Sequence, residues 1–151
     1  MKKVIDYMIL VLLIGPIILF SSDKSFIPSS QQVILTSNTI INNPENNKMW
    51  IPDKQQTEVA LIKVFIFLKK NSNSEIAMII KNKNKYGVQF IGKIKNNKKY
   101  IFCNFFPYKE DVKNIWKTTR ILVFGGGFWY WNIEYNIEDD KCESLWINGP
   151  I

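Results

Sequence analysis

The pattern of hydrophobic and polar positions divides the chain into three parts. Residues 4–20 form an apolar run that follows two lysines. Residues 23–48 are rich in serine, asparagine and glutamine around a short apolar stretch at 33–35. Beyond them, apolar residues recur at the spacings of helices and strands. The pattern therefore predicts an N-terminal signal peptide or signal anchor (1–22), a polar spacer that holds at most a brief strand, and one folded domain (49–151).

The N-terminal part has the character of an export signal. The basic pair Lys2-Lys3 precedes the apolar run, and Gly15-Pro16 breaks that run near its end. Phe20 is bulkier than signal peptidase prefers near a cleavage site, and the run is short for a segment that must span a membrane with about 17–25 residues. Two interpretations stay open: membrane contact through residues 4–20 as an uncleaved anchor, or a cleaved signal and a periplasmic or secreted domain. Both predict an exported protein of the cell envelope, whereas a buried helix of a cytosolic protein is the less favoured alternative.

The first part of the domain predicts one long helix. Pro52 and Asp53 are residue types that favour a helix start, and residues 57–68 carry a wide apolar stripe at helical spacing. The run 64–67 is rich in β-forming residues, so a buried strand is the competing interpretation. Residues 75–80 fit either a second short helix or an edge strand.

The second half predicts two antiparallel hairpins. Tyr86–Ile94 alternates in hydrophobicity, Asn96-Asn97 suits a two-residue turn, and residues 100–106 return. In the second hairpin, 121–124 runs through three glycines into a strand, and 141–147 returns. The predicted fold is α+β: one long helix packed on a curved four-stranded antiparallel sheet and preceded by an N-terminal apolar helix.

Scattered motifs across residues 50–151 resemble a group of uncharacterised small exported bacterial proteins. The motifs are a Trp-x-Pro helix start, Tyr-x-x-Gln-x-x-Gly and Asn-x-Phe on strands, a tryptophan, a Gly-Gly turn, an aromatic-x-Ile-x-Tyr strand and a closing Asn-Gly. They stand here at Trp50, Pro52, Tyr86, Gln89, Gly92, Asn104, Phe106, Trp116, Gly126, Gly127, Trp131, Ile133, Tyr135, Asn148 and Gly149. The resemblance implies a cystatin-like or NTF2-like arrangement of helix and sheet, and it implies no activity.

Composition narrows the chemistry. The chain has no histidine, which excludes Ser-His-Asp and Cys-His catalysis and histidine metal ligation. Its two cysteines, Cys103 and Cys142, are too few for a four-thiolate zinc site. Whether they form a disulfide depends on the order of the strands, because their α-carbons must approach within about 7 Å. We therefore expect no catalytic site, no metal and no cofactor.

The net charge of +7 raises the question of nucleic-acid binding. Arg120 is the only arginine, whereas base and phosphate recognition rely on the planar guanidinium fork. The lysines are dispersed among asparagines and isoleucines, as in 81–85. This composition predicts a solvated basic surface and no nucleic-acid partner, with electrostatic adhesion to anionic lipid through residues 81–99 as a weaker alternative.

The candidate binding residues lie on the aromatic strand after the three glycines. Alternation predicts Trp129, Trp131 and Tyr135 on one face and Tyr130 and Glu134 on the other. One face packs on the helix, and the other offers aromatic side chains to a ligand or partner. Glu134, among aromatic residues, is the one candidate general acid or base. The three glycines themselves predict a bend, because a phosphate-binding loop continues into a helix.

The sequence therefore favours a non-enzymatic exported or membrane-anchored domain that binds a small ligand, a partner protein or a second copy of itself (a homodimer) on its sheet. The alternative is an NTF2-like enzyme with a pocket containing Glu134. Geometry separates the two, because an enzyme needs Glu134 at the floor of a closed pocket, whereas a binding domain leaves it solvated or ion-paired.

Overall fold

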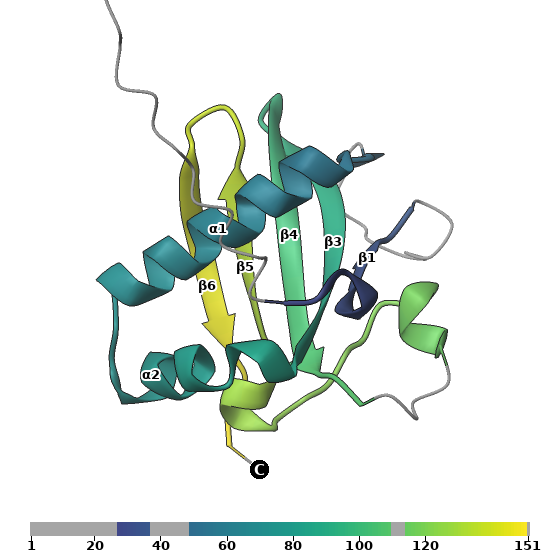
Figure 1. The fold of residues 1–151 in the computed structure, drawn as a ribbon. Helices are drawn as coiled ribbons and strands as arrows, with labels where there is room; N and C mark the ends of the chain where they lie inside the picture. The colour runs from purple at the N-terminus through teal and green to yellow at the C-terminus, as the bar shows by residue number, and fades with distance from the viewer. Residues whose placement is uncertain (1–26, 37–48, 110–113, 151) are drawn as a thin grey trace, which may run out of the picture.

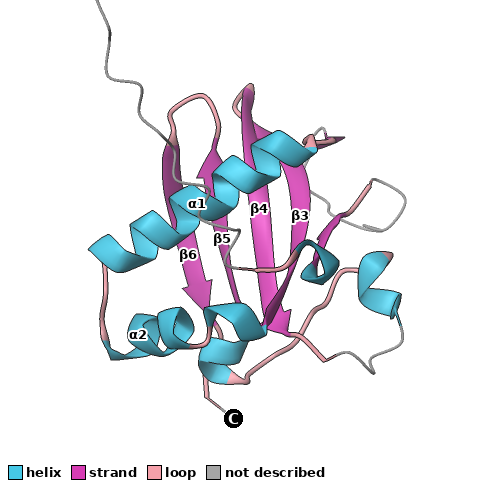
Figure 2. Cartoon of the chain, viewed as in Figure 1, coloured by secondary structure: helices cyan, strands magenta, loops and turns pink. Residues whose placement is uncertain are grey.

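A computed structural model of the chain describes residues 27–36, 49–109 and 114–150. They form a mixed α+β fold in which two helices lie on one face of a six-stranded sheet (Figure 1; Figure 2). The predicted N-terminal apolar helix falls outside these residues. None of the helices in the described ranges is long and apolar enough to cross a membrane.

Helix α1 (Lys54–Lys70) begins where the sequence indicates. Asp53 accepts a hydrogen bond from the Gln56 amide at 2.8 Å, and the Gln56 side chain accepts one from the Asp53 amide at 2.9 Å. This reciprocal capping box satisfies two amide groups that the helix itself leaves unpaired. Lysines occupy the last turn, where the helix dipole favours positive charge. The helix runs diagonally across the sheet (Figure 1).

A second helix, α2 (Ser74–Lys81), resolves the ambiguous segment 75–80. Asn73 caps it by accepting a hydrogen bond from the Ile76 amide at 2.8 Å. Ile76 and Ile79 are buried against the core. The prediction of a single helix is therefore wrong, because a short amphipathic segment with a good cap also finds an apolar surface to cover.

Two long hairpins form the centre of the sheet. In the first hairpin, the turn between the strands 86–95 and 98–107 contains Asn96 and Asn97. Both have positive φ (50° and 61°), as the predicted two-residue turn requires. The strands follow the order β1-β3-β4-β5-β6, with β2 also paired to β3. Their bounds are β1 (Gln32–Ile34), β2 (Met49–Trp50), β3 (Tyr86–Lys95), β4 (Lys98–Pro107), β5 (Trp131–Asn136) and β6 (Lys141–Ile147). Short 3₁₀ segments are η1 (Ser29–Gln31), η3 (Lys83–Lys85), η4 (Asn114–Lys117) and η5 (Gly127–Trp129).

The prediction of a four-stranded, purely antiparallel sheet is wrong. Strand β1, from the segment predicted as spacer, pairs in parallel with β3, and β2 pairs with the same strand antiparallel. Both are too short to show a period of two, so tertiary pairing rather than local pattern creates them. The β2 pairing is close: a side chain at Gly92 would meet the Trp50 carbonyl oxygen at 2.1 Å.

Residues 121–124 do not form the predicted strand. The Ile121 amide and carbonyl bind side chains on the sheet, the Gln89 oxygen at 2.8 Å and the Asn104 amide at 2.9 Å. Because these side chains satisfy the backbone groups of Ile121, that residue pairs with no strand, and 121–124 run as a loop. The strand β5 accordingly begins at Trp131, after the turn η5.

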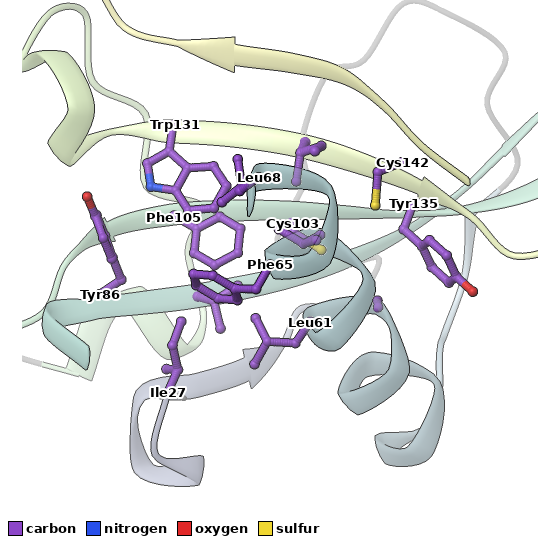
Figure 3. Close-up of a cluster of buried hydrophobic side chains, with 14 of the residues drawn as sticks. Ile27, Leu61, Phe65, Leu68, Tyr86, Cys103, Phe105, Trp131, Tyr135 and Cys142 are labelled. Carbon is purple, nitrogen blue, oxygen red and sulfur yellow. The ribbon is translucent and has the colours of Figure 1, made fainter. Parts of the chain in front are cut away.

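The main core lies between the helices and the sheet (Figure 3). Trp131 stacks on Phe105 with ring centroids 3.7 Å apart and planes at 4°, and Tyr86 meets Trp131 edge-on at 5.8 Å. Phe65 of α1 packs edge-on against Phe105 at 6.5 Å. Ile27, which precedes η1, is completely buried in the same cluster. A smaller cluster of Leu35, Ile91 and Phe102 lies apart from this core.

Candidate functional site

A cavity lies at one end of the sheet, where β4 ends and β5 begins. It encloses about 690 Å³. Its lining comes from four separate segments: Gln31, Asn84, Lys85, Pro107, Tyr108, Lys109, Gly126, Trp129 and Tyr130. We call it the end groove. It contains Trp129 and Tyr130, two of the five residues predicted as binding residues from the sequence.

The three glycines set the position of these two aromatic side chains. All three have positive φ, between 56° and 93°, a conformation that only glycine adopts readily. A side chain at Gly126 would also meet the Tyr130 ring at 2.4 Å. The Asn148 amide holds the loop by donating to the carbonyls of Val123 (2.6 Å) and Gly125 (2.9 Å). The predicted bend is confirmed. It places the rings of Trp129 and Tyr130 in the lining of the end groove.

A second, smaller cavity of about 210 Å³ adjoins the end groove. The two share Pro107, Tyr108, Lys109 and Tyr130, and the smaller one adds Phe106, Trp116 and Ile121. Tyr108 meets Trp116 edge-on with ring centroids 5.8 Å apart. The Tyr108 backbone amide donates to the Lys85 carbonyl at 2.8 Å. This hydrogen bond joins the segment that carries Lys85 to the segment that carries Lys109.

The described lining of both cavities is aromatic and basic. Lys85 and Lys109 supply positive charge, and no aspartate or glutamate is among the lining residues. Aromatic side chains offer flat apolar surface, and Tyr and Trp also carry a hydrogen-bonding group. Such a groove suits a flat apolar molecule with a negative charge.

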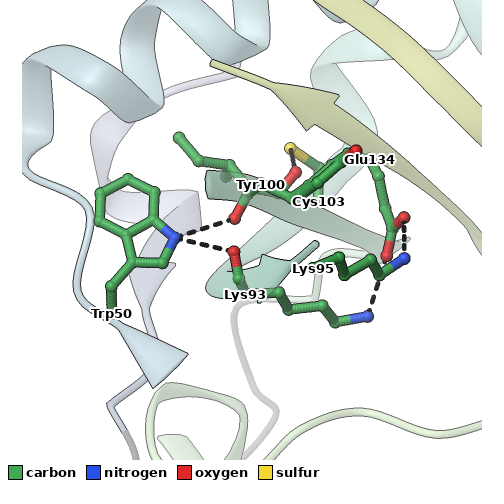
Figure 4. Close-up of polar contacts among 7 residues, drawn as sticks. Trp50, Lys93, Lys95, Tyr100, Cys103 and Glu134 are labelled. Carbon is green, nitrogen blue, oxygen red and sulfur yellow. Dashed lines mark hydrogen bonds and ion pairs between the residues drawn. The ribbon is translucent and has the colours of Figure 1, made fainter. Parts of the chain in front are cut away.

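Glu134 lies on the opposite side of β5 from the main core, and it is ion-paired (Figure 4). Its side chain is 6% exposed and accepts from Lys93 at 3.1 Å and from Lys95. Burial alone would raise the pKa of this carboxyl, but the hydrogen bond to Lys95 and the charge of Lys93 outweigh burial and lower it. The ion-paired position predicted for a binding domain is confirmed. Glu134 lines neither the end groove nor the smaller cavity beside it.

A network of side-chain amides holds the loop 116–121 on the face of the sheet opposite the main core. The Gln89 side chain donates to the carbonyls of Trp116 (2.6 Å) and Thr119 (2.8 Å). The Asn104 amide donates in turn to the Gln89 oxygen at 3.0 Å. Gln89 has no exposed surface, and its bonds to Trp116 and Asn104 are buried, whereas the bond to Thr119 is partly buried. The resulting clamp holds residues 116–121 in one place.

The remaining candidates, Trp131 and Tyr135, lie in the core under α1 (Figure 3). Their side chains are buried, and the Tyr135 hydroxyl donates to Asp140 at 2.7 Å. The structure thus separates the five candidates: Trp129 and Tyr130 at the end groove, Trp131 and Tyr135 in the core, and Glu134 on the opposite face. A ligand in the groove can meet only the first pair.

The two cysteines are buried and not linked. Cys103 lies on β4 and Cys142 on β6, with β5 between them. Two strand spacings are about 9.5 Å, which exceeds the reach of a disulfide. Burial raises the pKa of Cys103 well above its ordinary value and that of Cys142 to about 12. Both are structural thiols. Among the described residues, no group of three or more cysteine or acidic side chains could hold a metal ion.

Sequence reasoning missed Tyr108 and Lys109 of the end groove. They follow Pro107, which ends β4, and only the placement of the glycine loop beside them makes them part of a site. The available signal was the aromatic residue directly after a strand-ending proline. It is weak, since aromatic residues are frequent throughout this chain.

Comparisons of the chain with protein-family models, with curated proteins and with solved structures found no match. The resemblance to small exported bacterial proteins therefore stays a prediction from the motifs alone.

Proposed function

We propose that this chain is a non-enzymatic binding domain whose end groove takes a small ligand with a flat apolar body and a negative charge. The observation that carries the proposal is the groove itself: about 690 Å³, walled by Tyr108, Trp129 and Tyr130, with Lys85 and Lys109 as its charged residues. Small-molecule sites typically enclose about 300–1,000 Å³ and combine apolar walls with a few polar groups.

Two features favour binding over catalysis. Glu134, the candidate acid or base, is held by two lysines and does not line the groove. The titratable groups among the described lining residues are tyrosines and lysines. The groove therefore has the means to hold a ligand and little means to transform one.

The proposal includes the envelope location that residues 2–20 indicate by their sequence. Fractionation of cells that express the full chain tests it. Recovery from the cytosol alone, with no membrane-associated or exported pool, contradicts it.

Calorimetric titration of the full-length chain with naphthalene-2-sulfonate tests the binding site itself. The uncharged match is 2-naphthalenemethanol. We expect saturable binding of the sulfonate and at least about fivefold weaker binding of the alcohol, because the lysines attract the anion. Lys109→Glu should weaken sulfonate binding about fivefold or more. Lys141→Glu, an equal charge reversal at the far end of the sheet, should leave it unchanged.

Two outcomes would contradict the proposal. One is the absence of saturable heat with either naphthalene compound. The other is equal weakening by Lys109→Glu and Lys141→Glu, which would mean that the overall charge of the protein attracts the probe and that the groove does not.

A further inference from the structure

Arg120, the single arginine of the chain, occupies a position that the binding groove does not explain. It lies in the loop that the buried amides of Gln89 and Asn104 clamp. Its neighbours are held on both sides: the Thr119 carbonyl accepts from Gln89 at 2.8 Å, and the Ile121 amide donates to the Gln89 oxygen at 2.8 Å. The backbone that carries Arg120 is therefore preorganised, so a ligand pays little to order it.

Arg120 is partly buried and forms no salt bridge with an acidic side chain among the described residues. It lies over the ring of Phe102, 4.6 Å from the centroid. Its Nε is buried and donates no hydrogen bond within residues 27–36, 49–109 and 114–150. The Nε–H is one of the five N–H donors of the guanidinium fork, and burying it without an acceptor costs free energy. An oxyanion beside Arg120 would supply the acceptor that this Nε–H lacks.

The surrounding charge also favours an anion. Lys93 lies on the same Phe102 ring, its Nζ 3.9 Å from the centroid. Lys93 and Lys95 share the one carboxylate of Glu134, and Arg120 adds a third positive charge to this face. Three cations thus accompany one carboxylate in a half-buried setting, where electrostatic attraction is stronger than in water.

A small recess beside Arg120 has room for an oxyanion. It measures about 50 Å³, more than the roughly 10–15 Å³ that one water needs. Asn104, Asn132 and Asn148 contribute to its lining. The amide groups of Asn104 and Asn148 are occupied by backbone carbonyls. The Asn132 side-chain amide donates no hydrogen bond within residues 27–36, 49–109 and 114–150, so it is available as a donor.

We infer that Arg120 and Asn132 form a binding site for an oxyanion, a carboxylate or a phosphate, on the sheet face opposite α1. The guanidinium fork provides two parallel donors, Asn132 a third, and Lys93 the supporting charge. The end groove is lined by other cations, Lys85 and Lys109, so this site stands whether or not the groove binds its ligand.

The single arginine makes a direct test available, because the protein has only one Arg Nε–Hε resonance in a ¹H–¹⁵N correlation spectrum. The ¹⁵N-labelled full-length chain is titrated with sodium phosphate, sodium acetate and sodium chloride at matched ionic strength. We expect a saturable shift of the Arg120 Nε–Hε and Asn132 side-chain resonances with phosphate or acetate, and no saturation with chloride. Saturation by acetate alone identifies a carboxylate site, and saturation by phosphate alone identifies a phosphate site.

Two variants sharpen the result. Arg120→Lys keeps the charge and removes the fork, so binding followed through the Asn132 amide should weaken at least about tenfold. Lys117→Gln removes an exposed cation from the same loop and should leave the titration unchanged. Shifts that stay linear and equal for all three salts would overturn the inference. Equal weakening by both variants would also overturn it, since general charge would then explain the binding.

Discussion

The two faces of the sheet use alternate residues of the same strands for different purposes. On β5, Trp131 and Ile133 face the helices in a dry aromatic and aliphatic core. Glu134, between the buried neighbours of that core, faces the other way and is buried as well. The helix face gains stability from non-directional apolar burial. The opposite face gains specificity, because its buried amides and charges must each find a defined partner.

This difference explains how one loop finds its place. Residues 116–121 pack on the opposite face through hydrogen bonds from Gln89 and Asn104, which no helix or strand ladder supplies. Hydrogen bonds have fixed lengths and directions, so they select one arrangement of a loop where apolar contact alone would accept several. The position of Arg120 depends on that selection.

The largest expected effect is on the helix face. Trp131→Ala should lower the free energy of unfolding by about 3–5 kcal/mol, because it removes the ring that stacks on Phe105 and leaves a cavity. Urea denaturation measures the loss. Trp146→Ala is the matched control, since that side chain is 65% exposed and its removal should change stability by less than about 0.5 kcal/mol. Equal losses at the two positions would contradict the assignment of the core.

An intermediate effect is expected from the amide clamp. Gln89→Leu should cost about 2–3 kcal/mol, because the carbonyls of Trp116 and Thr119 lose their buried donor. Hydrogen exchange gives a local readout: the Ile121 amide, which donates to Gln89, should lose its protection. Gln55→Leu, on the exposed side of α1, serves as the control. Unchanged exchange at Ile121 in the Gln89 variant would show that something else holds the loop.

The smallest expected effect concerns the ion cluster and depends on pH. Because the folded protein lowers the pKa of Glu134 below 4.5, the ion pairs stabilise the fold above that pH and cease to do so as pH falls through the lower folded value. Glu134→Gln should therefore cost about 1–2 kcal/mol at pH 7, and the deficit should shrink on acidification below pH 4.5. Denaturant midpoints at several pH values measure it.

Asp139→Asn is the control for this last experiment. It removes the exposed Lys98–Asp139 pair, in which both side chains are 46% exposed, and surface pairs contribute about 0–1 kcal/mol. A larger loss there than at Glu134 would mean that burial does not strengthen the Glu134 cluster.

Where local signals are strong, sequence and structure agree in detail. The helix start at Asp53, the turn at Asn96-Asn97, the bend at the three glycines and the ion-paired Glu134 all follow from residue chemistry within a few positions or from a general rule about buried charge. Of the candidate site, Trp129 and Tyr130 came from the sequence, whereas Tyr108 and Lys109 required the fold.

Elements whose stabilising contacts are local can be predicted from their own residues. Helix α1 begins at its capping residue Asp53, and the β3–β4 hairpin turns at Asn96-Asn97, so neighbouring residues specify both elements. Three other features depend on contacts between distant segments: the parallel pairing of residues 32–34 with β3, the loop at 121–124, and the position of Arg120 over Phe102. The physical reason is the same in each case. A short strand, a loop and a partly buried charge are stable only when distant groups supply hydrogen bonds or packing surface, and no local pattern shows where those groups will be.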